Sequence, residues 1–369
     1  MRKGWEYKRL DECANIEYGT RVVQKKDSGT LYPVYGGGGE TFRLDKFNRE
    51  DCLIVARFAM SRRCVRFVNG KFFLNDSGLS VKAGDKLYQS YLNYNIISLN
   101  DDIYHLGKGA AQRNLDVKSF KKLTIAIPPQ STQLAIVSEL DKINELIRLK
   151  KEQLKDFDNL AQSLFYEMFG DPVENEKGWE VKKLGEIGEF KNGLNFSKDE
   201  NGHSIKFLGV SDFQNKKSIA SDQLAYISLS ERVQEDYLLK TDDIVFVRSN
   251  GKKELIGRSV KMYITEPTTY SGFCIRCRIT DEKVDKDYIA ILLKTPIIRQ
   301  FMTNSGRGCN ISNLNQKVLN SIPTILPPLS LQRLFAQRIE QIEREKSEVQ
   351  KSIQNLETLQ ASRMQYWFE

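Results

Sequence analysis

The feature that most constrains the fold of this chain is an internal repeat. Residues 108–143 read KGAAQRNLDVKSFKKLTIAIPPQSTQLAIVSELDKI, and residues 307–342 read RGCNISNLNQKVLNSIPTILPPLSLQRLFAQRIEQI. At a constant offset of 199, nine positions are identical, and each copy passes from a glycine-led loop through a short apolar run and a Pro-Pro pair into a helical pattern. Because such a repeat is one structural unit used twice, the chain is predicted to consist of two similar halves.

A second, shorter repeat opens each half. GWEYKRLDECANIEYG occupies residues 4–19, and GWEVKKLGEIGEFKNG occupies residues 178–193, at an offset of 174. Since the first repeat has an offset of 199, the second half holds 25 more residues between its repeated stretches. The halves are therefore predicted to share their ends and to differ in their middles.

Each middle consists of short strand-like runs separated by Gly, Asn and Asp, which is typical of a twisted mixed sheet. We therefore expect the α+β class, with two similar α/β domains joined by two long helices. The expected domains cover residues 1–128 and 171–327, and the expected spacer helices cover residues 129–170 and 328–369.

Each Pro-Pro pair is followed by five heptads whose a and d positions are largely apolar. This pattern is typical of a coiled coil, and the prolines mark where each helix begins. We predict that the two helices pair as an antiparallel coiled coil, which would relate the two domains by a pseudo-two-fold axis. The predicted pairing residues are Ile136, Leu140, Ile143, Ile147, Leu154, Phe157, Phe335, Ile339, Ile342, Val349, Ile353 and Leu356.

The net charge of +8 is unevenly distributed along the chain. Residues 1–128 carry +8 and residues 172–327 carry +3, whereas residues 129–171 carry −3 and residues 328–369 are neutral. This distribution favours globular parts that bind a polyanion and helices that bind each other. A merely basic soluble surface is the alternative explanation.

Cationic side chains cluster between two strand-like runs in each half, and the glycine-led loops add further hydrogen-bond donors. Arginine can bind guanine edges at two points, asparagine can do so for adenine, and lysine or arginine neutralise phosphates. A solvated basic hairpin is the alternative explanation. The candidate DNA-binding residues are Arg57, Arg62, Arg63, Lys108, Arg113, Asn114, Arg248, Asn250, Lys252, Lys253, Arg258, Arg307, Asn310 and Asn313.

Two further features accompany these clusters. A Ser-Gly step, expected inside a strand, follows each cluster at Ser77-Gly78 and Ser271-Gly272, and an offset of 194 suggests that the two steps are counterparts. Gly36 to Gly39 are not a P-loop, because no Lys-Ser/Thr follows at the required spacing. These glycines permit either a mobile turn or a loop that faces DNA.

Other features limit the possible classes of site and location. The six cysteines are scattered, Cys274 and Cys277 form a lone C-x-x-C, and the chain has two histidines, so we expect neither a disulfide framework nor a metal site. No run approaches the roughly 18 apolar residues of a membrane span, and the N-terminus lacks the apolar core of a signal peptide. We expect a cytoplasmic protein without a membrane contact.

The repeated motifs in this order resemble the specificity subunit of type I restriction–modification systems, over essentially the whole chain. The W-E-x-K-x-L openings, the four glycines after Tyr-Pro-Val-Tyr, the G-x4-N-L loops and the Pro-Pro-x-Ser-x-Gln helix starts all carry the resemblance. It implies that each domain recognises one half of a split, asymmetric site in double-stranded DNA, and the different middles imply two different half-sites.

The resemblance also implies partners. The paired helices would set the gap between half-sites and dock two methyltransferase subunits, and restriction/translocase subunits would complete the complex. No Asn-Pro-Pro-Tyr or Asp-Pro-Pro-Tyr motif, Walker A motif or persuasive nuclease cluster occurs in the sequence. We therefore expect no catalytic residues and no cofactor on this chain, with S-adenosylmethionine and ATP bound by the partner subunits.

Two functions of other classes remain as alternatives. The chain could be a stand-alone DNA-modifying enzyme with a hidden catalytic centre in one recognition domain, and methyl transfer by the chain alone would then be detectable. It could instead be a coiled-coil adaptor without a DNA role. Binding to duplex DNA would then lack the steep salt dependence that phosphate contacts cause.

Overall fold

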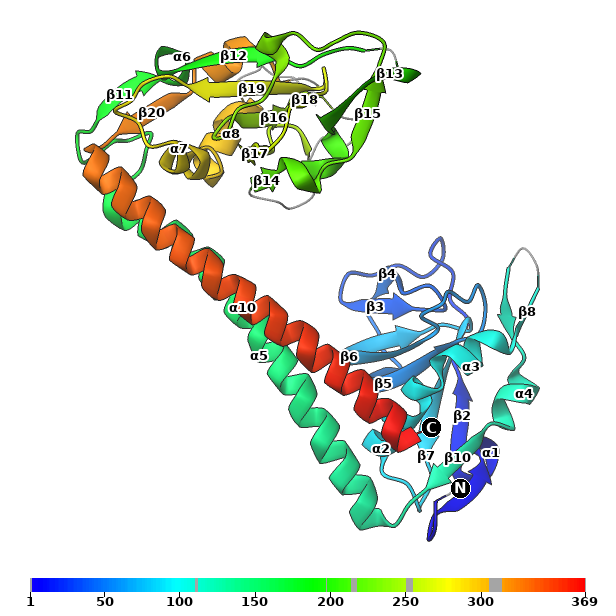
Figure 1. Cartoon of the computed structure of the whole chain (residues 1–369). Coiled ribbons are helices and arrows are strands. Elements are labelled where there is room, and N and C mark those ends of the chain that lie inside the picture. The colour runs from blue at the N-terminus through cyan, green and yellow to red at the C-terminus, as the bar shows by residue number, and fades with distance from the viewer. Residues whose placement is uncertain are drawn as a thin grey trace. The chain divides into compact units, whose positions relative to one another are not determined.

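The structure is a computed structural model that describes residues 2–109, 112–196, 198–213, 218–249, 255–304 and 314–368. The chain forms two compact units, Met1–Gln153 with Val349–Glu369, and Leu154–Glu348. The predicted domain boundaries follow the ends of the two long helices, whereas the compact units divide both helices near their middles. Each unit therefore contains one globular half and a part of helix α5 (Gln130–Phe169) and of helix α10 (Leu329–Phe368) (Figure 1).

The first globular half is built on a six-stranded sheet of order β2-β7-β5-β6-β3-β4, in which only β3 and β6 pair in parallel. A buried apolar core lies between this sheet, the short helices and the ends of the two long helices. The strands are β2 (Ala14–Tyr18), β3 (Tyr32–Tyr35), β4 (Glu40–Leu44), β5 (Arg49–Ala56), β6 (Val65–Leu74) and β7 (Gly78–Ala83). The other elements are α1 (Leu10–Cys13), α2 (Gln89–Ser98), α3 (Asn100–His105), β8 (Gly107–Lys108), β9 (Asn114–Leu115) and α4 (Val117–Lys121).

The second globular half has a five-stranded sheet, β12-β19-β16-β17-β14, and a separate three-stranded sheet, β15-β13-β18. The first sheet consists of β12 (Gly188–Asn192), β14 (Ser218–Ala220), β16 (Ile244–Val247), β17 (Ser259–Tyr263) and β19 (Cys274–Ile279). The second consists of β13 (Lys198–Leu208), β15 (Tyr226–Leu229) and β18 (Thr268–Tyr270). The helices are α6 (Leu184–Ile187), η1 (Val210–Phe213), η2 (Ser221–Gln223), η3 (Glu235–Tyr237), α7 (Lys286–Leu292), α8 (Pro296–Asn304) and α9 (Gln316–Asn320).

The two repeated stretches of each half meet in a strand pair. In the first half, β1 (Glu6–Arg9) from the opening repeat pairs antiparallel with β10 (Thr124–Ile127), the apolar strand before Pro-Pro. In the second half, β11 (Glu180–Lys183) pairs in the same way with β20 (Pro323–Leu326). The repeats are therefore the frame that closes each half, and the 25 additional residues of the second half lie inside that frame.

The two long helices run antiparallel in each unit. In the first unit, Asn144 of α5 accepts a hydrogen bond from Gln360 of α10, and Lys151 forms an ion pair with Glu357 at 2.8 Å. In the second unit, Asp158 forms an ion pair with Lys346 at 2.5 Å. As the residue number increases along α5, the residue number of its contact in α10 decreases. The predicted antiparallel pairing of the two helices is therefore observed.

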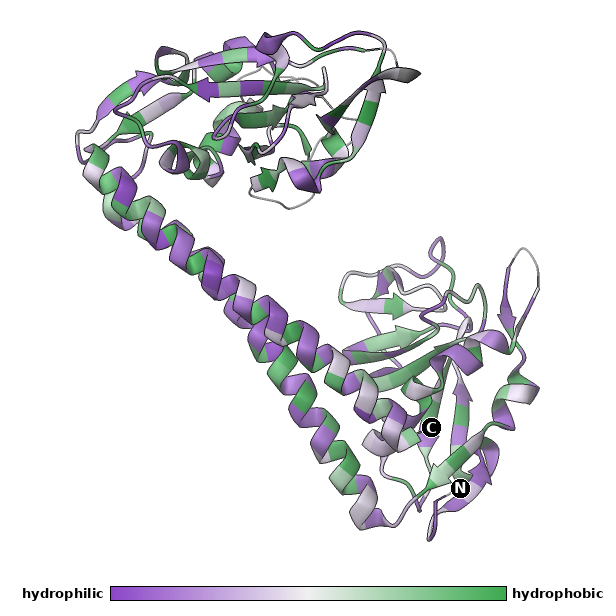
Figure 2. Cartoon of the chain, viewed as in Figure 1, coloured by the Kyte–Doolittle hydropathy of each residue, from purple (hydrophilic) through white to green (hydrophobic). Residues whose placement is uncertain are grey.

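The residues that the heptads select lie on buried or half-buried positions of the two helices, several of them within the apolar cores of the two halves. Figure 2 shows hydrophobic residues recurring among hydrophilic ones along both helices. At the end of α5 the buried residues are Phe165 and Phe169, which pack on Phe335 with ring centroids 5.7 and 5.2 Å away. Ile136, Leu140, Ile143, Ile147, Phe335, Ile339, Ile342, Val349 and Ile353 are buried, and Leu154, Phe157 and Leu356 are half-buried.

Candidate nucleic-acid interface

In each half, the central strands of the main sheet have two ends: one adjoins the long helices, and we call the other the loop end. In the first half, β5 ends at Ala56, which pairs with Gly78 at the start of β7. In the second half, β16 ends at Val247, which pairs with Cys274 at the start of β19. Arg57 and Arg248 begin the cationic stretches predicted to bind DNA and follow β5 and β16 directly, so both arginines lie at this loop end.

Arg57 and Arg248 occupy the same position at the loop end. The Arg57 N–H donates to the Ser77 carbonyl, and its carbonyl accepts from the Leu115 N–H, both at 2.8 Å. The Arg248 N–H donates to the Phe273 carbonyl, and its carbonyl accepts from the Leu314 N–H, again both at 2.8 Å. In each half the arginine is therefore held between the start of a central strand and the asparagine-leucine end of the glycine-led loop.

This hydrogen bonding corrects the prediction about the Ser-Gly steps. Neither step lies inside a strand, because Ser77 precedes β7 and Ser271-Gly272 lies in the turn before β19. The turn bonds, Gly78 N–H to the Asn75 carbonyl and Cys274 N–H to the Ser271 carbonyl, are equivalent. Phe273, and not Ser271, is therefore the counterpart of Ser77, since a strand position is defined by its backbone partners and not by its side chain.

The remaining candidates of the first half lie on two loops that contact each other. The Met60 N–H donates to the Arg113 carbonyl at 2.9 Å, and the Ala59 N–H donates to the Asn114 side chain at 3.3 Å. The guanidinium carbons of Arg62 and Arg113 lie 5.8 and 4.8 Å from the centre of the Tyr104 ring. The structure thus brings residues from separate parts of the sequence to one surface.

These candidates differ in how free their side chains are. The side chains of Arg62 and Arg63 are exposed, whereas Arg113 is half-buried and donates to the Tyr104 carbonyl at 3.2 Å. Lys108 is 78% exposed and forms an ion pair with Asp116 at 2.6 Å. That ion pair is the first cause that lowers the pKa of the Asp116 carboxyl to about 2.

Of the second-half candidates, Arg248 and Arg258 are described. Both are half-buried, and the Arg258 carbonyl accepts from the Val247 N–H at 2.9 Å. Burial and the neighbouring Arg258 guanidinium lower the pKa of Arg299. The candidates Asn250, Lys252, Lys253, Arg307, Asn310 and Asn313 lie outside the described residues.

The structure adds residues that the sequence analysis did not select. Arg248 lines a small pocket of about 360 Å³ together with Asn192, Asn315, Gln316 and Lys317. Lys317 is one of the nine identical positions of the repeat, and that identity was a signal for including it. Its lining residues are of polar or cationic types, which suits a phosphate oxygen or a base edge.

Gly36 to Gly39 pack against the protein's own loop end. The Gly37 N–H donates to the Ser77 hydroxyl at 3.2 Å, and Arg66 donates to the Gly37 carbonyl at 3.1 Å. A side chain on Gly37 would overlap the backbone oxygen of Phe58. The glycines therefore permit a close approach between two loops of the same domain.

The opposite end of each sheet joins the long helices through a buried glutamine. Gln133 accepts from the Tyr88 N–H at 2.9 Å and donates to the Lys86 and Pro128 carbonyls at 2.9 and 3.0 Å. Gln332 makes the same three contacts, with the Asp285 N–H and with the carbonyls of Lys283 and Pro327, at 2.8, 3.5 and 2.7 Å. The repeated Pro-Pro-x-Ser-x-Gln sequence thus fixes how each helix leaves its domain.

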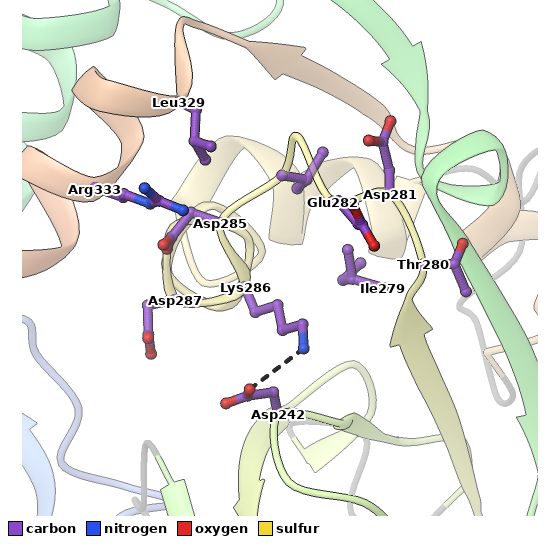
Figure 3. A pocket seen from close by; sticks show the side chains of 11 residues that line it. Asp242, Ile279, Thr280, Asp281, Glu282, Asp285, Lys286, Asp287, Leu329 and Arg333 are labelled. Carbon is purple, nitrogen blue, oxygen red and sulfur yellow. Dashed lines mark hydrogen bonds and ion pairs between the residues drawn. The ribbon is translucent and has the colours of Figure 1, made fainter.

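A pocket at this helix end in the second unit has the wrong charge for a polyanion. It has a volume of about 470 Å³ and lies where β19 ends and α10 begins (Figure 3). Carboxylates outnumber cations in its lining, and Lys286 lies 3.4 Å from Asp242. A negative helix end and a cationic loop end give the second half a charge polarity that favours DNA at the loops.

The cysteines of the C-x-x-C sequence cannot share a ligand. Cys274 packs in one apolar cluster and Cys277 in another, because residues three apart in β19 point to opposite faces of the sheet. Burial raises the pKa of both thiols, that of Cys274 to about 12. Across the described ranges, no cluster of His, Cys, Asp or Glu could hold a metal ion.

No helix in this part of the chain is long and apolar enough to cross a membrane.

Known proteins are similar to this chain in sequence and in fold. A family model described as the type I restriction modification DNA specificity domain matches residues 2–156 and again residues 176–358. The chain belongs to this family. It is 25% identical over 269 residues to the type I restriction enzyme StySPI specificity subunit of Salmonella potsdam, covering 69% of this chain and 58% of that protein. It is 24% identical over 314 residues to the MjaVIII specificity subunit of Methanocaldococcus jannaschii, covering 77% and 73%.

This chain matches 58% of the length of the StySPI protein and 58% of the EcoKI specificity subunit of Escherichia coli, less than two thirds of either.

Solved structures agree on the fold. The S subunit of a type I system from M. genitalium has a TM-score of 0.56 at 18% identity, covering 98% of this chain and 95% of that one. A chain of the type I system, from a structure on complex assembly and conformational transition, has a TM-score of 0.63 at 17% identity, covering 100% and 98%.

Proposed function

We propose that the chain is a non-catalytic, sequence-specific DNA-binding subunit of a cytoplasmic type I restriction–modification complex. Each α/β half binds one part of a bipartite, asymmetric site in double-stranded DNA through its loop end. The paired helices carry two methyltransferase subunits, to which restriction/translocase subunits are added. S-adenosylmethionine and ATP bind to those partners.

The observation that carries the proposal is the repeated arginine position. Arg57 and Arg248 sit on equivalent backbone hydrogen bonds at the loop ends of the two halves, each bonded to a repeated leucine, Leu115 or Leu314. One frame that presents different neighbouring side chains is what recognition of two different half-sites requires. The cationic sequences that follow both arginines support contact with DNA and not with a neutral ligand.

Selection from a pool of random duplexes tests the proposal. The full chain, purified with the methyltransferase subunits of its own system, should enrich one bipartite motif with a fixed gap. Enrichment of a single uninterrupted motif, or binding without steep salt dependence, would contradict it. Methyl transfer by the chain without any partner would instead indicate the enzyme alternative.

Single substitutions separate the two half-sites. Arg248→Ala should relax base preference in one half of the motif and Arg57→Ala in the other, each weakening binding by roughly 5- to 100-fold if a bidentate base contact is lost. Arg63→Ala, at an exposed position of the first half, tests whether that side chain contacts bases or phosphate. A loss that is equal across unrelated sequences would identify a phosphate contact.

The outer face of α5 supports the partner part of the proposal. Leu134, Leu146 and Leu149 are 49%, 47% and 46% exposed, and helical spacing places them away from the buried seam residue Ile147. A shallow groove of about 770 Å³ runs along this face from Leu134 to Leu146. Exposed leucines in a row are costly in water, and an apolar face of a partner would cover them.

Adjacent substitutions distinguish docking from helix pairing. Leu149→Asp should leave the chain folded but weaken its co-elution with methyltransferase subunits, because an exposed apolar contact is replaced by a charge. Ile147→Asp should also unfold the helix pair, since Ile147 is 8% exposed and a buried carboxylate has no partner there. Size-exclusion chromatography and circular dichroism measure both effects, and unchanged co-elution of Leu149→Asp would argue against docking on this face.

A further inference from the structure

Among the exposed aromatic side chains of the described residues, Phe273 has the largest exposed fraction, 60%. It stands at the loop end of the second half, where its carbonyl accepts from the N–H groups of Arg248 at 2.8 Å and of Ser249 at 3.4 Å. Its counterpart Ser77 accepts from Arg57 and Phe58 at 2.8 and 3.3 Å. The second half therefore exposes an apolar ring at a position where the first half has a small polar side chain.

The cover over this position also differs. In the first half, the Gly37 N–H donates to the Ser77 hydroxyl, so the glycine-rich turn lies on Ser77. The second half has no such contact among its described residues, and the Phe273 ring is left in water. The exposed ring is apolar surface that a binding partner can cover, and removing apolar surface from water is favourable.

The backbone that carries Phe273 is rigidly held. The Phe273 N–H donates to the Ser271 hydroxyl at 3.2 Å, and the neighbouring Gly272 N–H donates to the Leu194 carbonyl at 2.8 Å. A side chain at Gly272 would overlap the side chain of Asn195, so the turn is also tightly packed. A ring on a fixed backbone loses little conformational entropy when it is covered, which favours its use as a contact.

We propose that Phe273 is a base-contacting residue of the second recognition domain. Its neighbours Arg248 and the polar pocket beside it offer donors to phosphate and base edges, whereas an uncharged ring has no favourable contact with phosphate. The ring contacts a base instead, through the methyl group of a thymine or by partial insertion at a base step. This inference rests on the proposed DNA-binding function and names a specificity determinant within it.

Phe273→Ser gives the second half the residue of the first half and tests the inference. The full chain, with its methyltransferase subunits, is selected on random duplexes, and affinity for the enriched duplex is measured at several salt concentrations. We expect roughly 5- to 100-fold weaker binding, relaxed preference at one or two adjacent positions of one half-site, and an unchanged salt slope, because no phosphate contact is lost.

Tyr226→Ala is the matched control, since Tyr226 is 57% exposed in the same half but lies on β15, away from Arg248 in the sequence and in another sheet. Thermal unfolding of both variants checks for a folding defect, because the Tyr226 hydroxyl donates to Glu266 and Lys206 Nζ lies 4.1 Å from the centre of its ring. If the base preference of Phe273→Ser is unchanged, the inference is overturned while the proposed function stands. The same holds if the variant binds its methyltransferase subunits more weakly but keeps its base preference. If the wild-type chain enriches no bipartite motif, the proposed function itself is contradicted.

Discussion

The two globular halves place an arginine on the same backbone hydrogen bonds, but the surroundings of the two guanidinium groups differ. Arg57 lies 5.1 and 4.4 Å from the ring centres of Tyr18 and Phe58 and donates to the Asp76 carbonyl at 3.2 Å. Arg248 instead lines a polar pocket with Lys317. The repeat therefore preserves a backbone position while the side chains around it change.

The preserved part has a steric basis in both halves. A side chain on Gly19 would overlap the backbone oxygen of Asn75, and one on Gly193 would overlap that of Ser271. The two glycines are identical residues of the opening repeat, and both bring the end of the first sheet strand against the turn that precedes the central strand. Backbone contacts of this kind do not depend on which bases a domain binds, whereas the exposed side chains do.

The largest expected effect tests whether the joint between domain and helix is the same in both halves. Gln133→Leu and Gln332→Leu should each lower the free energy of unfolding of their own unit by about 3 kcal/mol, because a buried N–H and two carbonyls lose a partner. Hydrogen exchange, resolved by segment, measures the two losses separately. Gln130→Leu in the first unit and Gln337→Leu in the second, at exposed positions of the same helices, are the controls. Losses that differ widely between the halves would show that the joints are not equivalent.

A smaller effect should distinguish the two arginines. Arg57→Ala should destabilise the first unit by about 1–2 kcal/mol, since it removes two ring contacts and a hydrogen bond. Arg248→Ala should change the stability of the second unit by less than about 0.5 kcal/mol, as is usual away from packed features. Urea unfolding checks the difference, and equal losses would mean that Arg248 has a structural role of the same weight.

The smallest effect concerns the helix caps. Asp116 caps α4 and has a pKa lowered from 3.8 to about 2, first by its bond to Lys108, whereas the corresponding cap of α9 is the uncharged Asn315. A lowered folded-state pKa means that the carboxylate stabilises the first half above about pH 4 and loses this effect as the pH falls towards 2. A carboxyl-carbon NMR titration should show this midpoint, and Lys108→Ala should raise it. An unchanged midpoint in that variant would exclude Lys108 as the main cause.

The sequence alone determined the doubled frame. The prolines, the apolar strands and the heptads are local patterns, and each predicts its own element because helix and strand periodicity depend on near neighbours. The heptads are an example, since every residue that they select is buried or half-buried, although Ile136 and Phe335 lie within the cores of the two halves. The pairing of β1 with β10 was not predicted, although each of the two strands lies in a stretch that is repeated in the second half.

Only the tertiary structure decided which residues meet at the loop ends. Arg62 and Arg113 share the ring of Tyr104, and Ser77 matches Phe273 and not Ser271, although the sequence offers an identical Ser-Gly pair. The reason is physical. A turn is placed by hydrogen bonds to distant strands, and these depend on backbone geometry that the intervening residues set jointly. The position and exposure of Phe273 follow from those bonds and from no local pattern.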